Sequence, residues 1–299
     1  MRVLLVVKSS KYEWEKKTLN LTHDELMAKY ESEKANIKVI MASHERQELA
    51  KKWLHNQLGG PVFSLDDFRD TLFRACVPYG PFVESRPDLI VVLGGDNSVT
   101  AVLQDSYDVP VITVNSDPQL SVGCLTRWRV DDSNHLFKLM EAINHGKYRM
   151  EEWTRLETDR HSTAISEVFV GETKRNDMSR HILEYRGKSY EQKCSGLIVA
   201  TGCGSTGWYS SVNWHRTVEE NKFAPTEKLA KFVITEPSRY SKGCELREGV
   251  LEPGEEMVLH SLNDSGGIVS IDTWTELPFA RGSSVAIKLG SPAKVVVPL

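Results

Sequence analysis

Asp96 is the residue whose type and position most directly suggest chemistry. It follows Gly94 and Gly95 at the end of the aliphatic run 89–93, and a helix-like segment comes after it. In open α/β sheets, ligands bind outside the carboxyl ends of strands, so we expect this turn to line a site. Glycines let backbone N–H groups approach phosphate oxygens, and a helix N-terminus attracts anions. The turn, which includes Asn97, therefore predicts a phosphate-binding site.

An ionised Asp96 at such a turn has the properties that a phosphoryl transfer needs. It can orient a sugar hydroxyl and accept its proton, or hold a metal ion that does part of that work. Lys8 follows the first expected strand at its carboxyl end and is a candidate phosphate contact on geometry alone. Simpler alternatives stay open: Asp96 or Asn97 caps a helix in an ordinary turn, and Lys8 is a solvated lysine.

The segments around this turn alternate between strand-like and helix-like patterns, which is typical of parallel βαβ units. We expect strands at residues 3–7, 37–41, 89–93 and 109–114, and helices at residues 24–32, 45–58, 65–75 and 132–144. Ser64 is the expected N-cap of the third helix, and Gly146 is the expected stop of the fourth. Because the strand-like runs are unbroken and aliphatic, both faces of the sheet should be covered.

The second half of the chain has a different sequence pattern, with short strand-like runs in place of alternating strands and helices. Short strand-like runs at residues 164–170, 196–200, 232–235 and 285–289 alternate with Gly, Pro and Asp. The sequence therefore predicts an α/β protein with two domains. These are an open parallel-sheet, Rossmann-like domain at residues 1–146 and a mainly β domain at residues 147–299. The C-terminal segment is a candidate to pack back on the first domain.

The composition argues against several classes of protein. With 37 basic and 41 acidic residues among 299, the overall charge favours neither nucleic acid nor an anionic membrane as a partner. The five cysteines form no C-x-x-C pair, which argues against structural zinc and a disulfide framework. No run approaches the roughly 20 apolar residues of a membrane span, and the strand-like run at 3–7 leaves no room for a targeting segment. We expect a cytoplasmic protein and assign no residues to a metal site.

Four segments in a shared order resemble motifs of the NAD kinase family. Gly94, Gly95, Asp96 and Asn97 match its G-G-D-G turn, residues 115–118 match N-S-D-P, residues 166–172 resemble N-E-V-F-I-G-E, and residues 195–197 with 201–208 resemble S-G-L…T-G-x-G-S-x-x-W. The last three segments and the opening residues 8–13 are closest to the mitochondrial-type branch. The resemblance spans roughly residues 3–211, and its specificity comes from the shared order and spacing of the motifs.

The resemblance implies an enzyme that transfers a phosphate from ATP, or in some members polyphosphate, to the adenosine 2′-hydroxyl of NAD, with Mg2+ assisting. It also implies the NAD kinase and diacylglycerol kinase-like fold. In that fold residues 1–146 would form the phosphate-donor domain and residues 147–299 the dinucleotide-binding domain. Asp96 would be the general base. We expect a homodimer or a higher homo-oligomer, because in this family a partner subunit commonly completes the nicotinamide pocket.

By position, the resemblance assigns a set of NAD-binding residues: Asn115, Asp117, Ser166, Glu167, Thr206, Gly207, Trp208 and Ser211. Ser166 and Glu167 would hold the adenosine part, and residues 206–208 would form the nucleotide-binding turn. A carboxylate suits a ribose diol, and an indole ring offers a flat stacking surface. Plainer roles stay open: a half-buried strand for Glu167, core packing for Trp208, an ordinary Gly-rich turn at 202–207, and a structural turn for Asn115 and Asp117.

Several positions depart from the family pattern. Asn97 replaces the last glycine of the turn, although Asn tolerates a positive φ better than most residues. Ser166 replaces an Asn, Trp208 replaces the more common Tyr, and Ser195 stands where many members carry Asp. Residues 272–273 are Asp-Thr where Asp-Gly is expected.

These departures leave three hypotheses for the function. The first is an active NAD kinase that uses NAD as substrate and releases NADP. The second is a related G-G-D kinase that acts on a sugar or lipid hydroxyl. The third is an NAD(P)-binding sensor that has lost catalysis. Asp96 and Glu167 favour an enzyme, whereas Asn97 and Ser166 favour an altered specificity.

Overall fold

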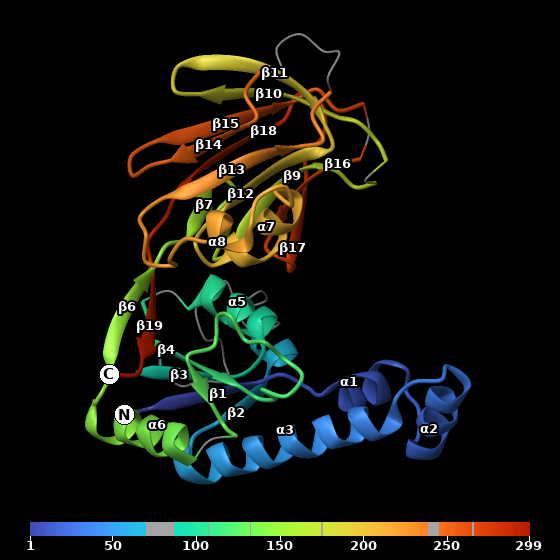
Figure 1. Cartoon of the computed structure of the whole chain (residues 1–299), viewed down its shortest axis with the longest axis vertical. Helices are drawn as coiled ribbons and strands as arrows, with labels where there is room; N and C mark the ends of the chain where they lie inside the picture. Colours follow the sequence, from blue (N-terminus) through green and yellow to red (C-terminus); the bar gives the residue numbers. More distant parts are fainter. Residues whose placement is uncertain (70–86, 107, 132, 175, 239–244, 265) are drawn as a thin grey trace. The chain divides into compact units, whose positions relative to one another are not determined.

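The computed structural model describes residues 1–69, 87–106, 108–131, 133–174, 176–238, 245–264 and 266–299. The chain divides into two compact units (Figure 1). Unit 1 contains residues 1–150 and 295–299, and unit 2 contains residues 151–294. The chain leaves unit 1 within strand β6 (Arg149–Trp153) and returns to it within strand β19 (Ala293–Val297).

Unit 1 is built on an open sheet with the strand order β2-β1-β3-β4-β19-β6, and the short β5 also pairs with β4. The other bounds are Val3–Val7 (β1), Val62–Ser64 (β2), Leu89–Gly94 (β3), Val111–Asn115 (β4) and Trp128–Arg129 (β5). The pairings that join β2, β1, β3, β4 and β19 are parallel. Strands β1, β3 and β4 are buried along their whole length, so the predicted open parallel sheet is confirmed.

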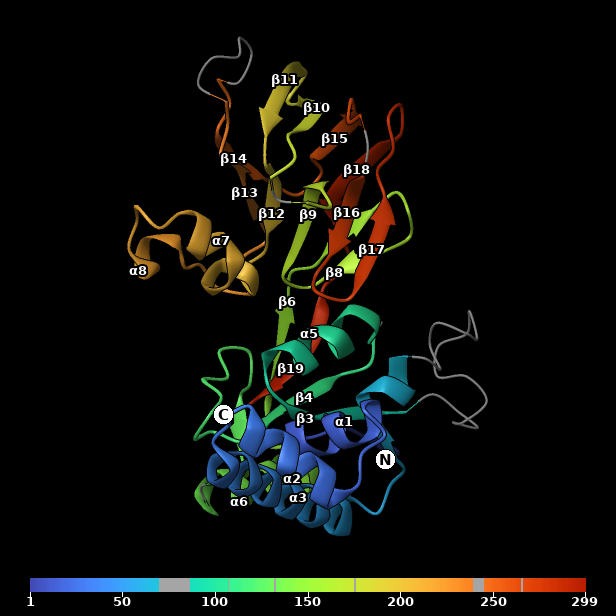
Figure 2. The same ribbon diagram turned by 90° about the vertical axis from the view of Figure 1, so that its right-hand side faces the viewer.

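Helices cover both faces of this sheet. Those of unit 1 are α1 (Lys11–Thr18), α2 (His23–Ser32), α3 (Ile37–Leu58), α5 (Asp96–Asp105) and α6 (Ser133–His145). Helices α3 and α6 share one core with alternate residues of β1 and β3, to which they contribute Leu54, Leu139 and Ile143. Helix α5 lies on the opposite side of the sheet (Figure 2) and is buried along most of its length. The sheet is thus positioned to present its carboxyl edge next to the start of α5.

The strand predicted at residues 37–41 is wrong, because these residues form the first turns of α3. The side chain of Asn36 caps this helix by accepting the N–H of Val39 at 3.2 Å. Ile37, Ile40 and Met41 pack on a small core that α1 and α2 complete. Their i, i+3, i+4 spacing is helical, and it outweighs the β-type composition of the run.

The other expected helices of unit 1 are found where the structure describes them. Residues 65–69 of the predicted 65–75 helix are helical, and the N–H of Asp67 donates to Ser64 Oγ at 3.0 Å. Residues 70–75 lie outside the described residues, as does residue 132 at the start of the predicted 132–144 helix. Gly146, with a φ of 64°, follows the end of α6.

Unit 2 is a sandwich of two antiparallel sheets. One sheet has the order β11-β10-β15-β18-β7-β8 and the other β14-β13-β12-β9-β16-β17. The bounds are Leu156–Thr158 (β7), Thr163–Ala164 (β8), Glu167–Glu172 (β9), Ser179–Tyr185 (β10), Lys188–Cys194 (β11), Gly196–Ala200 (β12), Ala230–Thr235 (β13), Glu248–Leu251 (β14), Glu256–Ser261 (β15), Gly267–Ile271 (β16), Thr275–Pro278 (β17) and Ser284–Leu289 (β18). This arrangement confirms the predicted mainly β second half.

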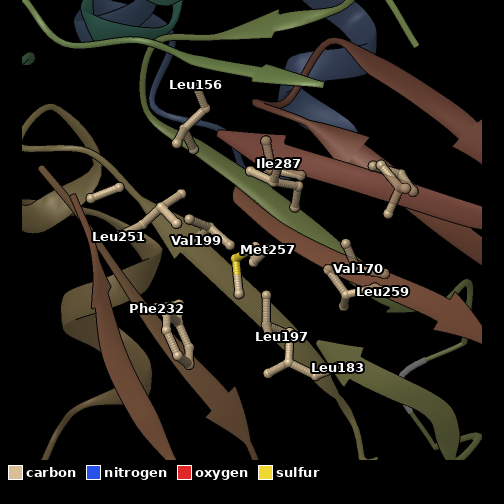
Figure 3. Close-up of a cluster of buried hydrophobic side chains, with 14 of the residues drawn as sticks. Leu156, Val170, Leu183, Leu197, Val199, Phe232, Leu251, Met257, Leu259 and Ile287 are labelled. Atoms are coloured by element: carbon tan, nitrogen blue, oxygen red, sulfur yellow. The ribbon is translucent and has the colours of Figure 1, made fainter. Parts of the chain in front are cut away.

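The core of unit 2 lies between its two sheets (Figure 3). Leu183, Leu259 and Ile287 come from one sheet, whereas Val170 and Leu197 come from the other, and all five are fully buried. The alternation of buried residues along β10, β15 and β16 follows the period of two that a half-buried strand requires.

A helical excursion between β12 and β13 packs on the outer face of the second sheet. It contains the 3-10 turn η1 (Gly204–Thr206), α7 (Trp208–Val212) and α8 (Val218–Asn221). Tyr209 of α7 joins Phe169, Ile198 and Val233 of the sheet in a second small core. None of the helices in the described part of the chain combines the length and the apolar character that a membrane crossing needs.

Candidate functional site

In unit 1, Asp96 lies at the carboxyl edge of the sheet, as the first residue of α5. Its Oδ2 accepts the N–H of Cys124 at 3.0 Å, and its Oδ1 accepts the N–H of Leu125 at 2.9 Å. Gly95 precedes it as the N-cap, and Gly94 pairs with Asn115 at the end of the neighbouring strand. The carboxylate is therefore held in place, partly exposed, at a helix N-terminus that favours negative charge.

The glycines of this turn leave room that side chains would fill. A Cβ on Gly94 would lie 2.4 Å from Ser98 Oγ and 3.3 Å from Lys8 Cβ. Lys8 is exposed and lies beside the turn, because its N–H donates to the carbonyl of Leu93 at 3.0 Å. Asn97 is exposed and helical, so this position does not need the positive φ that a glycine would supply.

Asn115 and Asp117 use most of their hydrogen-bonding capacity inside unit 1. The carboxylate of Asp117 accepts Arg46 Nε at 2.8 Å and Nη2 at 3.0 Å, and it also accepts Ser43 Oγ. Asn115 Oδ1 accepts the N–H of Asp117 at 3.0 Å, while its Nδ2 donates to the carbonyl of Ser121 at 3.1 Å. These contacts hold the loop in which Cys124 and Leu125 follow and donate their N–H groups to Asp96. They fit the alternative in which Asn115 and Asp117 have a structural role in a turn.

In unit 2, Asp272 organises the start of β9. Its carboxylate accepts the N–H groups of Ile165 at 3.0 Å, Ser166 at 2.8 Å and Glu167 at 2.9 Å. The residue itself has a left-handed backbone with φ 48°. The sequence singled out the Asp-Thr pair at 272–273 without giving it a role. The structure assigns Asp272 the role of a clamp on residues 165–167.

Glu167 carries a carboxylate in an unfavourable environment. Burial, together with the negative charge of Asp272, raises the pKa of Glu167 to about 7. Its side chain receives no hydrogen bond from the residues that the structure describes. A Cβ on Gly204 would lie 2.8 Å from Glu167 Oε2, so the glycine makes room for this carboxylate. A half-buried carboxylate without donors is stabilised by a ligand that brings hydroxyl groups to it.

The turn at 204–208 lies against Ser166 and Glu167 within the same unit. The N–H of Thr201 donates to the carbonyl of Ser166 at 2.9 Å, and a Cβ on Gly204 would lie 2.5 Å from that same carbonyl oxygen. Thr206 is half-buried, Gly207 is exposed, and Ser211 Oγ donates to the carbonyl of Gly207 at 3.2 Å. The structure thus brings the start of this turn next to Ser166 and Glu167.

Trp208 both packs on the protein and lines open space. Its ring lies 4.9 Å from the ring of Phe169, at an interplanar angle of 33°, and 38% of the residue stays exposed. A cavity of about 700 Å³ is lined by Trp208, Ser211 and Arg216, among others. A second cavity of about 260 Å³ lies between Trp208, Phe169 and Glu236. Sequence reasoning gave neither Phe169 nor Glu236 a role: Phe169 lies within the matched segment 166–172 but was not assigned to the site, and Glu236 lies in no motif.

One three-residue cluster in the described part of the chain has metal-ligand chemistry. Glu13, His44 and Glu48 have ligand atoms within 4.8 Å of one another. Lys51 Nζ already lies 3.1 Å from Glu48 and 3.8 Å from Glu13, and Ser10 Oγ lies 2.9 Å from His44 Nδ1. The ammonium group supplies the positive charge that a cation would bring, so this cluster is a structural ion-pair network.

Comparisons with known proteins agree with the expected resemblance. No family model matches the chain. It is 30% identical over 144 residues to an NAD kinase of Corynebacterium diphtheriae, which covers 44% of each chain. It is 33% identical over 141 residues to an NAD kinase of Photorhabdus laumondii, covering 42% of this chain and 45% of the relative. It is 30% identical over 178 residues to an NAD kinase of Salmonella typhimurium, covering 54% of this chain and 57% of the relative. These matches span about half the length of the relatives.

Solved structures extend the comparison to the whole fold. An NAD kinase from Archaeoglobus fulgidus in complex with ATP aligns with a TM-score of 0.61 and 19% identity, over 99% of this chain and 93% of that one. Yeast NADH kinase complexed with NADH aligns with a TM-score of 0.60 and 14% identity, over 100% of this chain and 84% of that one. The expected resemblance to NAD kinases, in sequence and in fold, is confirmed.

Proposed function

We propose that this chain is an NAD kinase, which moves the terminal phosphate of ATP onto the adenosine 2′-hydroxyl of NAD. The observation that carries the proposal is the position of Asp96, whose carboxylate is fixed beside a glycine turn at the carboxyl edge of a parallel sheet. Ligands of open α/β folds bind at such an edge. The three curated relatives described above are named NAD kinases, which supports the choice of substrate.

Unit 1 would hold the phosphate donor. The backbone around Gly94 and Gly95, the N-terminus of α5 and the side chains of Lys8 and Asn97 are placed to contact phosphate oxygens. Each Asp96 oxygen accepts one N–H, and a carboxylate has about four lone-pair sites, so capacity remains for a metal ion and a hydroxyl. Mg2+ fits this donor set, since it commonly binds through one carboxylate and the substrate phosphates. It would neutralise the charge that develops on those phosphates.

Unit 2 would hold the dinucleotide. Ser166 and Glu167 are placed to receive the adenosine ribose, whose hydroxyls can donate to the unsatisfied carboxylate of Glu167. Thr206, Gly207, Trp208 and Ser211 would form the adjoining wall. We keep Asn115 and Asp117 in the proposed site as residues that shape it, because their own contacts hold the loop that positions Asp96.

In the proposed reaction the 2′-oxygen of NAD attacks the γ-phosphorus of ATP. The bond from that phosphorus to the β,γ-bridging oxygen breaks, ADP leaves with the bond's electron pair, and the hydroxyl proton passes to Asp96. Positioning and charge neutralisation supply most of the acceleration in such transfers. A positioned general base typically adds a factor of about 10² to 10⁴. The fixed geometry of Asp96 fits that task.

We also propose that the protein works as a homodimer or a higher homo-oligomer in the cytoplasm. The family resemblance supports the oligomer, and the near-neutral composition supports a small-molecule enzyme with neither nucleic acid nor membrane as partner. Sedimentation velocity of the purified chain at micromolar concentration tests the oligomer, and a strictly monomeric species would refute it.

The proposed function is tested by incubating the protein with NAD, ATP and Mg2+ and measuring NADP with a coupled NADP-specific dehydrogenase. We expect NADP to accumulate with ATP and Mg2+ and not without them. Polyphosphate in place of ATP tests the alternative donor. Thermal shift gives a parallel readout, because a ligand at 100 times its Kd adds about 2.7 kcal/mol of stability. Stabilisation by NAD with no NADP formed would favour the sensor, and the absence of both would favour another acceptor.

A further inference from the structure

Unit 1 contains a cavity of about 490 Å³ that the proposed reaction does not use. It lies between α3, the loop after β4 and the start of α6, and the two helices share a core on one face of the sheet (Figure 1). Arg46, Leu49, Ala50 and Trp53 line it at the i, i+3, i+4, i+7 spacing, so one stripe of α3 forms a wall. Leu49 is 67% exposed and therefore marks the opening.

The rest of the lining adds further apolar side chains. Pro118 of the loop, Val130 and Leu136 of α6 are all partly buried and face the same space as Leu49 and Trp53. Small-molecule sites have volumes of roughly 300–1,000 Å³ and mostly apolar walls with a few polar groups. The cavity meets both conditions.

The polar groups of this cavity include hydrogen-bond donors without an acceptor. The hydroxyl of Ser116 makes no hydrogen bond to the described residues, although Ser116 is only 7% exposed. Arg46 donates to Asp117 through Nε and Nη2, which leaves its Nη1 without a partner among the same residues. A buried donor without an acceptor is unfavourable, so a ligand that accepts from these groups is stabilised.

The charges around the cavity favour an anion as this ligand. Among the described lining residues, Arg46 and Lys52 are the cations and Asp131 is the carboxylate. Asp117 offsets the charge of Arg46, and Arg129, 2.8 Å from Asp131, offsets the charge of that carboxylate. Lys52 is exposed and forms no ion pair with the described residues, so one positive charge stays uncompensated.

We propose that this cavity binds an amphipathic carboxylate, a short apolar chain that ends in one carboxylate group, and that the bound ligand restrains the loop that holds Asp96. The chain would lie against the apolar walls. The carboxylate would accept hydrogen bonds from Ser116 and Arg46, with the charge of Lys52 nearby. The inference goes beyond the proposed function, because it assigns a second site that takes no part in the phosphate transfer.

The loop that lines the cavity is also the loop that fixes Asp96. The N–H of Ser116 donates to the carbonyl of Gly94 at 3.3 Å, and the N–H of Leu125, later in the same loop, donates to Asp96 at 2.9 Å. A carboxylate that joins Ser116 to Arg46 restrains the start of this loop. We therefore expect a bound ligand to raise kcat and to leave KM for NAD unchanged.

The binding test is isothermal titration calorimetry of the whole chain with octanoate, without nucleotides. Hexanoate and butanoate should bind progressively more weakly, by up to about fourfold per methylene group, because the apolar walls cover the chain. Octan-1-ol has the same chain with a neutral head, so it should bind about tenfold more weakly than octanoate. The two series separate the contribution of the walls from that of the donors.

Two variants with matched controls locate the site. Leu49→Glu puts a negative charge at the opening and should weaken octanoate binding about tenfold, whereas Val39→Glu, at an exposed position of α3 outside the lining, should not. Lys52→Gln should weaken binding about threefold, and Lys38→Gln, also exposed on α3, should leave it unchanged.

The results that would overturn the inference are distinct from those that would overturn the proposed function. No octanoate binding, equal binding to wild type and Leu49→Glu, or equal binding of octan-1-ol and octanoate would each overturn the site. In the NADP assay, octanoate should raise kcat of the wild type and not of Leu49→Glu, and an unchanged kcat with octanoate bound would overturn the link to Asp96. If no NADP is formed at all, the proposed function fails, and calorimetry alone decides whether the site exists.

Discussion

The backbone N–H of Glu167 donates a hydrogen bond of 2.9 Å to Oδ1 of Asp272, while the two carboxylates repel each other. Asp272 thereby fixes the position of Glu167 and at the same time makes its ionisation unfavourable. Strongly perturbed pKa values cluster at functional sites. The pairing therefore supports the proposed binding site in unit 2.

The raised pKa of Glu167 predicts a specific dependence of stability on pH. The folded protein binds the Glu167 proton up to about pH 7, whereas the unfolded chain releases it near pH 4.5. Stability from this group is thus present at pH 4.5 and is lost as the pH rises to 7, by roughly 3 kcal/mol. We expect Glu167→Gln to be more stable than the wild type at pH 8 and about equally stable at pH 4.5 in urea unfolding. Glu256→Gln, which removes an exposed carboxylate from the other sheet of unit 2, is the control, and equal stability of Glu167→Gln and wild type at pH 8 would contradict the account.

The lowered pKa of His181, which also lies in unit 2, predicts the opposite dependence of stability on pH. Burial lowers the pKa of His181 to about 4, and neither ring nitrogen has a hydrogen-bond partner among the described residues. The unfolded chain binds this proton near pH 6.5, so stability is present above pH 6.5 and falls by roughly 3 kcal/mol as the pH drops to 4. In the wild type the two dependences largely cancel between pH 4.5 and 6.5.

His181→Leu should uncover the contribution of Glu167, so this variant should gain stability as the pH falls from 7 to 4.5. Glu167→Gln should conversely lose stability over that range. Urea unfolding of both variants at half-unit pH steps measures the two slopes. Slopes of the same sign would show that one of the two pKa assignments is wrong.

The ion pair between Arg46 and Asp117 should affect both the stability of unit 1 and the position of Asp96, because Asp117 belongs to the loop that holds Asp96. Its guanidinium makes two hydrogen bonds to Asp117, whose side chain is only 5% exposed. Arg46→Met leaves that charge buried, with Ser43 as its remaining side-chain partner among the described residues. We expect a loss of about 2 kcal/mol, less than for a fully buried pair because Arg46 is partly exposed, and a lower kcat with little change in the Kd for NAD.

Arg129→Met provides the comparison for Arg46. The Arg129–Asp131 pair has similar hydrogen-bond lengths but is more exposed, so its loss should cost under about 0.5 kcal/mol. Chemical denaturation and steady-state kinetics measure both variants. Equal destabilisation by the two substitutions would argue against a structural role for the Arg46–Asp117 pair.

The close contact between Gly196 and the ring of Phe169 suggests that this glycine keeps Phe169 in place beside the cavity of about 260 Å³. It has a φ of 152°, and a Cβ there would lie 2.3 Å from the ring of Phe169. Gly196→Ala should destabilise the protein by about 2 kcal/mol and weaken NAD binding by displacing that ring. Gly254→Ala also places an alanine at a positive φ, but in open space, so it should show the backbone cost alone. Unaltered NAD affinity in Gly196→Ala would remove Phe169 from the proposed site.

Much of unit 1 could be predicted because its signals are local. The aliphatic runs at 3–7 and 89–93 and the turn at Gly94–Asp96 are each contained in a few neighbouring residues. The strand prediction for residues 37–41 is wrong because the helical spacing of this run is decisive only where α1 and α2 supply a surface for it. Local composition alone did not reveal that packing.

The contacts that build the candidate site in unit 2 are long-range, and the sequence did not reveal them. Asp272 reaches Ser166 across 106 positions, and Ser195 reaches Glu236 across 41. Asp272 and Glu236 also both have a left-handed backbone with φ 48°, which few non-glycine residues adopt and which no local pattern in the sequence predicted. Motif matching located Glu167 and Trp208, but the cavity lining beside Trp208 becomes visible only when strands β9, β13 and β17 are brought together.

The most direct test of the central claim follows the transfer itself in wild type and Asp96→Asn. Each protein is mixed with NAD, Mg2+ and ATP labelled in its γ-phosphate, and labelled NADP is quantified and its 2′-phosphate identified by phosphorus NMR. We predict transfer by the wild type and at least a hundredfold slower transfer by Asp96→Asn. Thermal shift should show NAD still bound, with only a small loss of stability because Asn retains one of the two acceptor oxygens. An unchanged rate in Asp96→Asn would contradict the assignment of Asp96 as the base.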